Sequence, residues 1–597
     1  MIERCYVMKG FYGRILTVDL SEKNFTITPT DEGVLQRYLG GKGLASHLLF
    51  TLNPPGVDPL SSENRLIFAT GPVNGSPVWG SSRYGVFTKS PLTGYYLESY
   101  SGGKVPEAID NTGFDAVVIT GRSVGPVVLS IQPDTVIFHD AGDLWGLETY
   151  AAEDAVLKRF ADADAGYKKP GAVVIGPAAE NGVRFGIIAN DYWRCAGRGG
   201  AGTVMGSKNL KAVLFQGDRK RDLHDPDHIA QMAREMGKGA KDNPGAQAYR
   251  SMGTTMMVDL LNSAGAFPTR YWSKGVCEHR DAINADALHR QCSVKPHACL
   301  KCFMACGRLT TVGRGRHEGL TLEGPEYETI YAFGGLCMVD RIEEILYLND
   351  VCDRLGMDTI TAGNLCGLAI EASRRGIIDR RLKYGDVDAI AGLLNDIAHR
   401  NGLGDILAQG IQHTAAAWGL EDLAVHVKGM EPPGYDPRVL KGMGLSYASS
   451  DRGACHLRAT FYKPELAGMI APEQIEGKAE LFVDFEDRLT LFDCLVLCRF
   501  YRDQYGWEKL EEIIQAAIGF GLNKKALQQV AASVSNLVRR FNLREGLTSE
   551  KDDRLPPHLH QPMEDSGRVI TEAELNRLLK DYYRLRGWSE TGLPEEN

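Results

Sequence analysis

Four cysteines have the residue type and the spacing of ligands for an iron–sulfur cluster. Cys299, Cys302 and Cys306 form the pattern C-x2-C-x3-C, and Cys498 follows much later in the chain. Three clustered thiolates and a distant fourth can bind a four-iron cluster, which transfers single electrons. The pattern therefore indicates electron transfer as a chemistry to test.

Two other interpretations of these cysteines remain open. C-x2-C is also half of a common structural zinc site, although the sequence contains no second C-x2-C. Unpaired cysteines also pack as small apolar residues. Cys494 stands four residues before Cys498 and competes with it as the fourth ligand. The chain has 13 cysteines, an odd number without a dense framework, which argues against a disulfide-stabilised secreted protein.

Glu328 and His456 are candidates for acid–base chemistry. Glu328 lies in EGPEYE and His456 in DRGACHL. A carboxylate and an imidazole in one pocket can exchange protons with a reacting oxygen if their pKa values lie near the working pH. A single histidine is more often a structural residue, so the sequence alone leaves both interpretations open.

Two short motifs carry carboxylates that could bind a heterocycle. One is D-x-x-G-x-D from Asp353 to Asp358, and the other is D-x-x-x-x-C from Asp493 to Cys498. An ionised carboxylate only accepts hydrogen bonds, so each motif could bind the donor edge of a ring. The alternative is a helix cap and a surface charge.

The segment GRGGAG could bind phosphate. Its glycines match G-x-G-x-x-G, but the next apolar segment follows too soon for a Rossmann unit. Backbone N–H groups and nearby cations could still contact phosphate oxygens, whereas the alternative is a glycine turn with solvated basic neighbours. These glycines and cations are Gly197, Gly199, Gly202, Arg194, Arg198, Lys208 and Lys211.

The elements that must position these residues change character near residue 218. Short β-branched runs precede that point, and longer amphipathic segments follow it. The predicted strands lie in RILTVDL, RLIFAT, YGVFTKS, DAVVITG, VVLSIQ, AVVIG and KAVLFQG. The predicted helices cover 342–355, ended by Gly356, and lie within 361–376, 509–520 and 524–541. No internal repeat is evident in the sequence.

The sequence predicts an α+β protein of several domains, because 597 residues exceed one ordinary core. We expect a β-rich domain over 1–218, followed by mainly α-helical domains over 219–430 and 431–597. The second boundary is placed at the loop-rich stretch 429–442. The net charge of -9, without a long basic tract, argues against a nucleic-acid partner. Without a signal peptide or 18 uninterrupted apolar residues, we expect a cytoplasmic protein with no membrane insertion.

Together, these motifs resemble the tungsten-containing aldehyde ferredoxin oxidoreductase family, from GRILTVDLS near the start to YYRLRGW near the end. Further matching segments are GGKGLA, RYGVFTKSPLTG, SGG, AGRGGAGTVMGSKNLKA, EGPEYE, DRLGMD, YDPR, DRGACHL and DCLVLC. The resemblance implies a tungsten ion held by two molybdopterins, beside a [4Fe–4S] cluster. It also implies that the β-rich domain forms a base under this bis-pterin cofactor and that two helical domains close over it.

The resemblance assigns roles to individual residues. It makes Cys299, Cys302, Cys306 and Cys498 the cluster ligands, favours Cys498 over Cys494, and leaves little support for zinc. Arg83 would lie between the pterin and the cluster, where a permanently charged, multi-donor fork can bind a pterin and lower the cost of reducing the nearby cluster. Glu328 and His456 would transfer protons. The phosphate-side residues would be Gly102, Arg194, Gly197 and Arg198, with Mg²⁺ on the backbone carbonyls of Tyr100 and Cys195. The pterin motifs would be Asp353, Met357 and Asp358, and Asp493, Cys498 and Arg499.

Two positions depart from the family pattern. Val496 stands where the second pterin motif normally has Gly, so we expect a slightly different backbone or an altered contact there. Tyr347 and Asp350 stand where some relatives have an E-x-x-H motif that binds iron between two copies of the chain. We therefore expect no such bridging iron, and a possible oligomer would form without it.

The activity that the resemblance implies is oxidation of an aldehyde with water to a carboxylic acid. Electrons would leave through the cluster to ferredoxin or an iron–sulfur subunit, since the chain has no flavin or nicotinamide motif. Glu328 would accept a proton while His456 hydrogen-bonds to the carbonyl oxygen. The alternatives are a related tungsten enzyme that reduces an aromatic thioester, and a non-catalytic iron–sulfur or zinc protein.

Overall fold

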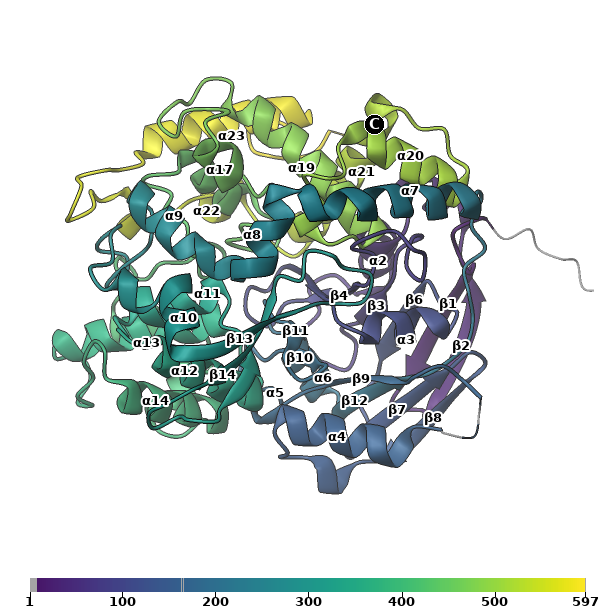
Figure 1. Cartoon of the computed structure of the whole chain (residues 1–597), viewed down its shortest axis with the longest axis horizontal. Helices are drawn as coiled ribbons and strands as arrows, with labels where there is room; N and C mark the ends of the chain where they lie inside the picture. The colour runs from purple at the N-terminus through teal and green to yellow at the C-terminus, as the bar shows by residue number, and fades with distance from the viewer. Residues whose placement is uncertain (1–7, 163, 165, 596–597) are drawn as a thin grey trace, which may run out of the picture.

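The fold combines two large β-sheets with a mainly helical remainder. A computed structural model describes residues 8–162, 164 and 166–595. The two sheets lie in the N-terminal part, and helices cover one of them and extend to one side (Figure 1). This arrangement confirms the predicted α+β class. No helix in the described part of the chain is both long and apolar enough to cross a membrane.

The two sheets share one topology. Each contains six strands, in the orders β2-β1-β6-β3-β4-β5 and β8-β7-β12-β9-β10-β11. In each sheet the first two strands along the chain form an antiparallel hairpin, and the first of them also pairs in parallel with the sixth strand. The sixth strand then pairs antiparallel with the third, the third with the fourth, and the fourth with the fifth. The structure therefore contains a repeat that the sequence does not reveal. The first sheet consists of β1 (Arg14–Asp19), β2 (Asn24–Pro29), β3 (Leu66–Ala69), β4 (Tyr84–Lys89), β5 (Tyr96–Ser101) and β6 (Ala116–Thr120). The second consists of β7 (Val127–Gln132), β8 (Thr135–Asp140), β9 (Gly171–Val174), β10 (Ile188–Asn190), β11 (Arg194–Ala196) and β12 (Leu210–Phe215).

The central strands of both sheets are buried on both faces, which explains their apolar sequences. Along β12, Val213 and Phe215 join a core shared by both sheets, whereas Ala212 and Leu214 face a second core under α4 (Thr149–Phe160). Alternate residues of a strand point to opposite faces, so both sets must be apolar. The outer face of the first sheet packs instead against helices near the N- and C-termini. The other helices among the sheet strands are α1 (Glu32–Tyr38), α2 (Gly41–Leu52), α3 (Val105–Asn111), α5 (Pro177–Glu180) and α6 (Ala201–Ser207).

The predicted strands and helices are confirmed where their patterns are strong. Each predicted apolar run contains a strand, and the segment ended by Gly356 forms α12 (Ile342–Leu355). Gly356 adopts a left-handed conformation with φ 79°, which glycine permits without a steric penalty. The other predicted helices are α13 (Thr359–Arg374), α20 (Trp507–Ile518) and α21 (Lys524–Arg544).

The remaining helices form the layers around the sheets. Those before α12 are α7 (Pro226–Gly239), α8 (Pro244–Met252), α9 (Met257–Ala264), α10 (Ala285–Gln291) and α11 (Tyr327–Thr329). Those after α13 are α14 (Val387–His399), α15 (Leu403–Leu407), α16 (Ile411–Trp418), α17 (Lys441–Ser449), α18 (Tyr462–Leu466), α19 (Lys478–Leu495), α22 (Ser549–Asp552) and α23 (Glu572–Arg586).

A small sheet interrupts the helical part and carries the clustered cysteines. It consists of β13 (Cys292–His297), β14 (Gly307–Val312) and β15 (Thr321–Glu323), and the sequence did not predict it. The C-x2-C-x3-C run lies in the connection between β13 and β14. Lys301 and Ala305 have positive φ angles there, so the loop turns sharply and points several thiols the same way.

Candidate active site

Two adjoining cavities contain most of the predicted site residues. The larger has a volume of about 380 Å³ and the smaller about 230 Å³. Seven residues line both cavities and form the wall between them: Arg83, Tyr100, Trp193, Cys195, Glu326, Cys498 and Phe500. The other residues of the two cavities come from the sheet ends, the cysteine hairpin and the helical layers.

The four predicted cluster ligands line the smaller cavity. Cys299, Cys302 and Cys306 reach it from the hairpin loop, and Cys498 reaches it from the segment after α19. The backbone N–H of Cys498 donates to the carbonyl of Gly80 at 2.9 Å, which fixes this segment against the first sheet. Cys494 is fully buried inside α19 and lines neither cavity. The structure therefore groups Cys498, and not Cys494, with the other three.

The smaller cavity brings four thiols around one space. Within the residues that the structure describes, no three His, Cys, Asp or Glu side chains come close enough to hold one metal ion. The thiols instead surround a space, as cluster ligands do. Gly102 belongs to the same wall, because a Cβ atom there would lie 2.8 Å from Cys299 Sγ and 3.4 Å from Arg83 Nη1. Only glycine permits this approach.

The ends of two edge strands meet beside this wall. Tyr100 in β5 and Cys195 in β11 occupy equivalent positions, each two residues before a glycine, Gly102 or Gly197. The Tyr100 carbonyl accepts a hydrogen bond from Arg83 Nη2 at 3.2 Å. The repeated topology therefore places two similar backbone turns beside the wall between the cavities.

Only part of the predicted basic loop faces the cavities. Arg198 lines the larger cavity and Arg194 the smaller. Lys208 is buried and donates to the carbonyls of Ser62 and Gly121, at 3.0 and 3.3 Å. Lys211 is likewise buried and forms an ion pair with Glu180. The suggestion that these two lysines contact phosphate is therefore wrong, because they are buried inside the fold and line neither cavity.

The first carboxylate motif lines the larger cavity. Asp358 caps α13, accepting from the backbone N–H of Ile360 at 3.1 Å, and it also pairs with Arg198 Nε at 3.1 Å. The capping interpretation therefore holds for Asp358, and the binding of a ring edge stays a prediction. Burial, followed by the nearby carboxylate of Asp350, raises the pKa of Asp353 well above its usual value. Met357, between these two aspartates, is also buried in the cavity wall.

The second carboxylate motif lines the same cavity at the end of α19. Burial alone would raise the pKa of Asp493, but the guanidiniums of Arg499 and Arg458 hold it below its usual value. Val496 follows α19 in a left-handed conformation, with φ 54° and ψ 48°. This is the same region that Gly356 occupies after α12. A β-branched side chain thus adopts a turn that favours glycine, and the expected difference from the family in backbone or contact stays a prediction.

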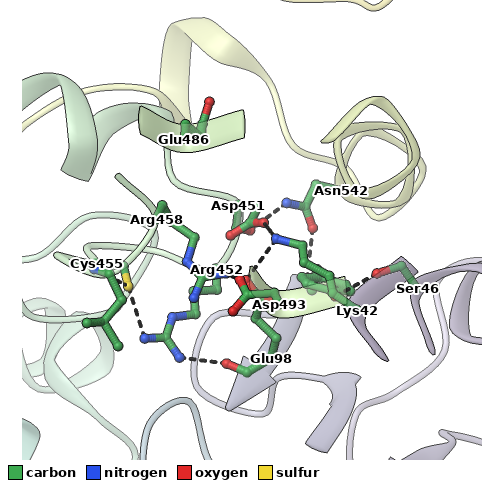
Figure 2. Close-up of polar contacts among 12 residues, drawn as sticks. Lys42, Ser46, Glu98, Asp451, Arg452, Cys455, Arg458, Glu486, Asp493 and Asn542 are labelled. Carbon is green, nitrogen blue, oxygen red and sulfur yellow. Dashed lines mark hydrogen bonds and ion pairs between the residues drawn. The ribbon is translucent and has the colours of Figure 1, made fainter. Parts of the chain in front are cut away.

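A buried network of charges holds the segment that contains His456. Lys42 Nζ in α2 donates to Glu98 Oε1 and to Asp451 Oδ2, each at 2.9 Å (Figure 2). Glu98 also pairs with Arg458, so residues 451 and 458 on both sides of His456 are held from the first sheet. The Glu98 side chain is 0% exposed. Sequence reasoning missed Lys42 and Glu98 as site residues, although single charges within GGKGLA and YYLESY were a usable signal.

Glu328 and His456 meet in the larger cavity. Glu328 Oε1 lies 3.5 Å from His456 Nε2, and Glu328 Oε2 accepts from the backbone N–H of Gly434 at 3.0 Å. In the part of the chain that the structure describes, Glu328 Oε1 and His456 Nδ1 are buried without a hydrogen-bond partner. Such atoms are rare in folded proteins and indicate a site that a ligand completes.

Burial gives this pair the ionisation behaviour of proton-transfer residues. Burial raises the pKa of Glu328 to about 7. Burial, followed by the positive charge of Arg198, lowers the pKa of His456 well below its usual value. Near neutral pH the carboxyl group therefore exchanges readily between its two forms, and the imidazole stays neutral. This arrangement can both accept a proton and hydrogen-bond to a bound oxygen.

Aromatic residues and a buried loop fix the positions of the pair. Glu328 lies in α11, which continues into a π-helix, η5 (Ile330–Leu336). The Tyr327 hydroxyl donates to the carbonyl of Gly434, and the Tyr435 ring stacks on His456 with centroids 5.4 Å apart. The loop from 429 to 440 is buried along its length. Of this loop, Tyr435 lines the larger cavity.

Tyr347 and Asp350, which replace the interface iron motif, have partners within the chain. The Tyr347 ring stacks on His317 with centroids 4.3 Å apart. Asp350 pairs with Arg354 Nε at 2.6 Å and accepts from the Tyr150 hydroxyl at 3.2 Å. The absence of a bridging iron stays a prediction.

The chain matches one protein family along most of its length. Residues 15–217 match the description "Aldehyde ferredoxin oxidoreductase, N-terminal domain", and residues 231–597 match "Aldehyde ferredoxin oxidoreductase, domains 2 & 3". The tungsten-containing aldehyde ferredoxin oxidoreductases of Pyrococcus furiosus and Thermococcus kodakarensis are both 34% identical to this chain. Each alignment covers 99% of this chain and 98% of the relative.

More distant relatives carry other names. The WOR-like subunit of an aliphatic sulfonate oxidoreductase from Pyrococcus furiosus is 28% identical over 99% of this chain and 96% of its own length. A solved structure, the active site complex BamBC of benzoyl coenzyme A reductase with 1,5 dienoyl-CoA, matches with a TM-score of 0.84. That match covers 98% of this chain and 96% of the other at 23% identity, so it supports the fold alone.

Proposed function

Because this chain belongs to the aldehyde ferredoxin oxidoreductase family, we propose that it oxidises aldehydes to carboxylic acids with water. For each aldehyde, one water is consumed, and two electrons and two protons are released. Cys299, Cys302, Cys306 and Cys498 would hold a [4Fe–4S] cluster, which would supply the route for the electrons to ferredoxin or to an iron–sulfur partner subunit. The observation that carries this proposal is the pairing of Glu328 with His456 in a cavity that adjoins the four cysteines.

The larger cavity fits the tungsten bis-pterin cofactor of the family. Carboxylates suited to the donor edges of two pterins stand at the ends of α12 and α19, in the motifs of Asp353 and Asp493. Cations and backbone turns suited to phosphates and Mg²⁺ lie at Arg194, Arg198 and the equivalent turns of β5 and β11. When bound, tungsten supplies a Lewis acid and a two-electron acceptor.

The protein residues move the protons. In its ionised form Glu328 accepts a proton from water or from the hydrated aldehyde, because the residue lines the cavity and its Oε1 has no hydrogen-bond partner among the described residues. His456, neutral and stacked on Tyr435, donates a hydrogen bond to the aldehyde oxygen as negative charge develops there. Burial of both residues excludes bulk water, which strengthens these interactions.

The wall between the cavities is suited to electron transfer. Cys498 lines both cavities, and Arg83 beside it contributes a permanent positive charge. A positive charge close to a cluster lowers the free-energy cost of adding an electron to it. Electrons would therefore leave the larger cavity through the side that the cysteines line.

The proposal is tested by anaerobic purification, measurement of W, Mo, Fe and Zn, and turnover of an aldehyde panel with viologen as acceptor. We expect tungsten with about four irons per chain and aldehyde-dependent viologen reduction. Bound zinc without tungsten or molybdenum would contradict the proposal. Turnover of an aromatic thioester without any aldehyde turnover would instead support the alternative function, which is reduction of an aromatic thioester.

A further inference from the structure

Arg502 is a buried cation in the larger cavity whose charge has no carboxylate partner. The residue is 2% exposed and lines the larger cavity but not the cysteine cavity. Its Nη1 donates to the Arg499 carbonyl at 2.9 Å, while its Nε has no hydrogen-bond partner. Among the described residues it forms no ion pair, and the neighbouring carboxylate of Asp503 pairs with Lys463 instead.

Two other arginines of this cavity also lack a carboxylate, but their surroundings differ. Arg83 stands in the wall between the cavities, on the side of the proposed cluster. Arg452 contacts the Glu98 carbonyl and Cys455 Sγ, within the network that holds the His456 segment. Arg502 lies neither in the wall between the cavities nor in this network, so its charge is available to a ligand.

Arg502 lies on the side of the cavity where the proton-transfer pair stands. The Tyr249 hydroxyl hydrogen-bonds to the Arg502 guanidinium, and the Tyr462 hydroxyl is close enough to interact with its charge. The Tyr462 ring stacks on Tyr435 with centroids 4.2 Å apart, and Tyr435 stacks on His456 in turn. A row of aromatic rings therefore runs from the catalytic imidazole towards the guanidinium.

The opposite wall near Arg502 is also aromatic. Phe500 packs on Tyr249 with ring centroids 4.6 Å apart, and both line the cavity. The ring centroids of His456 and Tyr462 are 6.5 Å apart, so Tyr462 belongs to the same aromatic group as the catalytic imidazole. Flat aromatic walls favour a flat ligand, because ring faces then pack in offset or edge contacts.

An unpaired buried cation is costly, and a bound anion would offset that cost. A guanidinium also matches a carboxylate in geometry, because its planar fork donates two parallel hydrogen bonds. We propose that Arg502 binds a carboxylate at the far end of the substrate, so that this enzyme prefers aromatic aldehydes that also carry a carboxylate. This inference rests on the proposed aldehyde oxidation.

A cofactor phosphate is the other anion that this cation could bind. The residues suited to phosphate lie at the ends of β5 and β11, and none of them contacts Arg502 in the hydrogen bonds and ion pairs described. The experiment separates the two anions, because loss of a phosphate contact would lower the cofactor content whereas loss of a substrate contact would not.

The test compares 4-carboxybenzaldehyde with its uncharged methyl ester in the cofactor-loaded enzyme. We expect the ratio of their kcat/KM values to be at least ~10, since a hydrogen-bonded charge pair contributes about 1.5–3 kcal/mol. In Arg502→Met the ratio should fall towards 1, and in Arg502→Lys it should be partly restored. Arg488→Met is the matched control, because Arg488 is a nearby arginine that lines neither cavity.

A binding measurement complements turnover. Terephthalate, the dicarboxylate product, should raise the Tm of the wild-type enzyme and of Arg488→Met, but not that of Arg502→Met. A wild-type ratio near 1 in an active enzyme would overturn the inference and leave aldehyde oxidation intact. Loss of tungsten and pterin in Arg502→Met would also overturn it, in favour of a cofactor phosphate. If neither aldehyde is oxidised by the metal-loaded enzyme, the proposed function fails instead.

Discussion

Gly71 and Gly176 occupy equivalent positions in the two sheets, and each lies against the last carbonyl of a long helix. Gly71 follows β3 and faces the carbonyl of Leu495, whereas Gly176 follows β9 and faces that of Leu355. The two helices end there in left-handed turns that begin beside the two carboxylate motifs. The repeated topology therefore extends beyond the sheets and gives the cavity two similar halves, as a cofactor with two pterins requires.

We expect Gly71→Ala and Gly176→Ala to displace these turns. An added Cβ would lie 2.2 Å from Leu495 O and 2.6 Å from Leu355 O, which is closer than atoms pack. Overpacking of this kind costs about 1–3 kcal/mol, and the displaced carboxylates should reduce the pterin content. Chemical denaturation and pterin fluorescence measure both effects. Gly125→Ala is the control, because no atom lies within 4 Å of the added methyl group.

Glu328→Gln should abolish most aldehyde turnover while tungsten and iron remain bound. The substitution keeps the shape of the side chain but removes the group that accepts a proton, an effect of roughly 10²–10⁴-fold on rate. Steady-state kinetics and metal analysis of the same preparation check both parts. Exposed Glu32→Gln serves as the control. Undiminished turnover would remove Glu328 from the mechanism.

The activity should rise with pH towards neutrality and then level off. Burial raises the pKa of Glu328 to about 7, and only the ionised form accepts a proton. Below that pH, kcat/KM should fall about tenfold per unit, because the reactive fraction falls in proportion. His456 stays neutral in this range, since burial lowers its pKa. A pH profile that is flat from 5 to 8 would contradict this assignment.

The stability of the cofactor-free protein should change with pH in the opposite sense. Since the pKa of Glu328 is higher in the folded protein than its ordinary value of 4.5, the unfolded chain loses this proton first as pH rises. The free energy of unfolding should therefore fall between about pH 4.5 and 7 relative to Glu328→Gln. Denaturation of both proteins across this range measures the difference, and parallel curves would show that the folded pKa is not raised.

Cys498→Ala should lose iron, and Cys494→Ala should retain it. Cys498 lines the cysteine cavity, whereas Cys494 is fully buried within α19. Iron analysis and the visible absorption of the cluster distinguish the two variants. Cys494→Ala should lose only about 1 kcal/mol of stability, because it removes one buried sulfur atom. Equal iron loss in both variants would argue that the segment, and not the thiol, holds the cluster.

The sequence predicts the apolar elements well and the polar ones poorly. The runs that became β6 and β12 are buried on both faces, so their apolar character is continuous and easily recognised. β5 contains Glu98 and two serines, although it is also buried. Its charge is stabilised by Lys42 and Arg458 from distant parts of the chain, which no local pattern records.

The candidate site was predictable where short motifs carry it. The cysteines, both carboxylate motifs, Glu328 and His456 all line the two cavities. Arg502 was not predicted, because an arginine reads as a surface residue until its burial and missing partner are known. Lys208 and Lys211, beside the glycine loop, were misassigned because the sequence does not show the buried groups that they contact. The repeat of the two sheets also escaped detection, because topology can persist without residue identity.

The buried bond between Lys42 and Asp451 joins residues 409 positions apart in the chain. Contacts of such long range form late, because closing a long loop has an entropic cost that must be met before the contact contributes. A ribosome that has synthesised both sheets has still produced only half of the cavity, since the closing turn at Leu495 belongs to α19. The half of the site at Asp493 should therefore form only after α19 has been synthesised, and a truncated chain that ends before α19 should bind less pterin than the full chain.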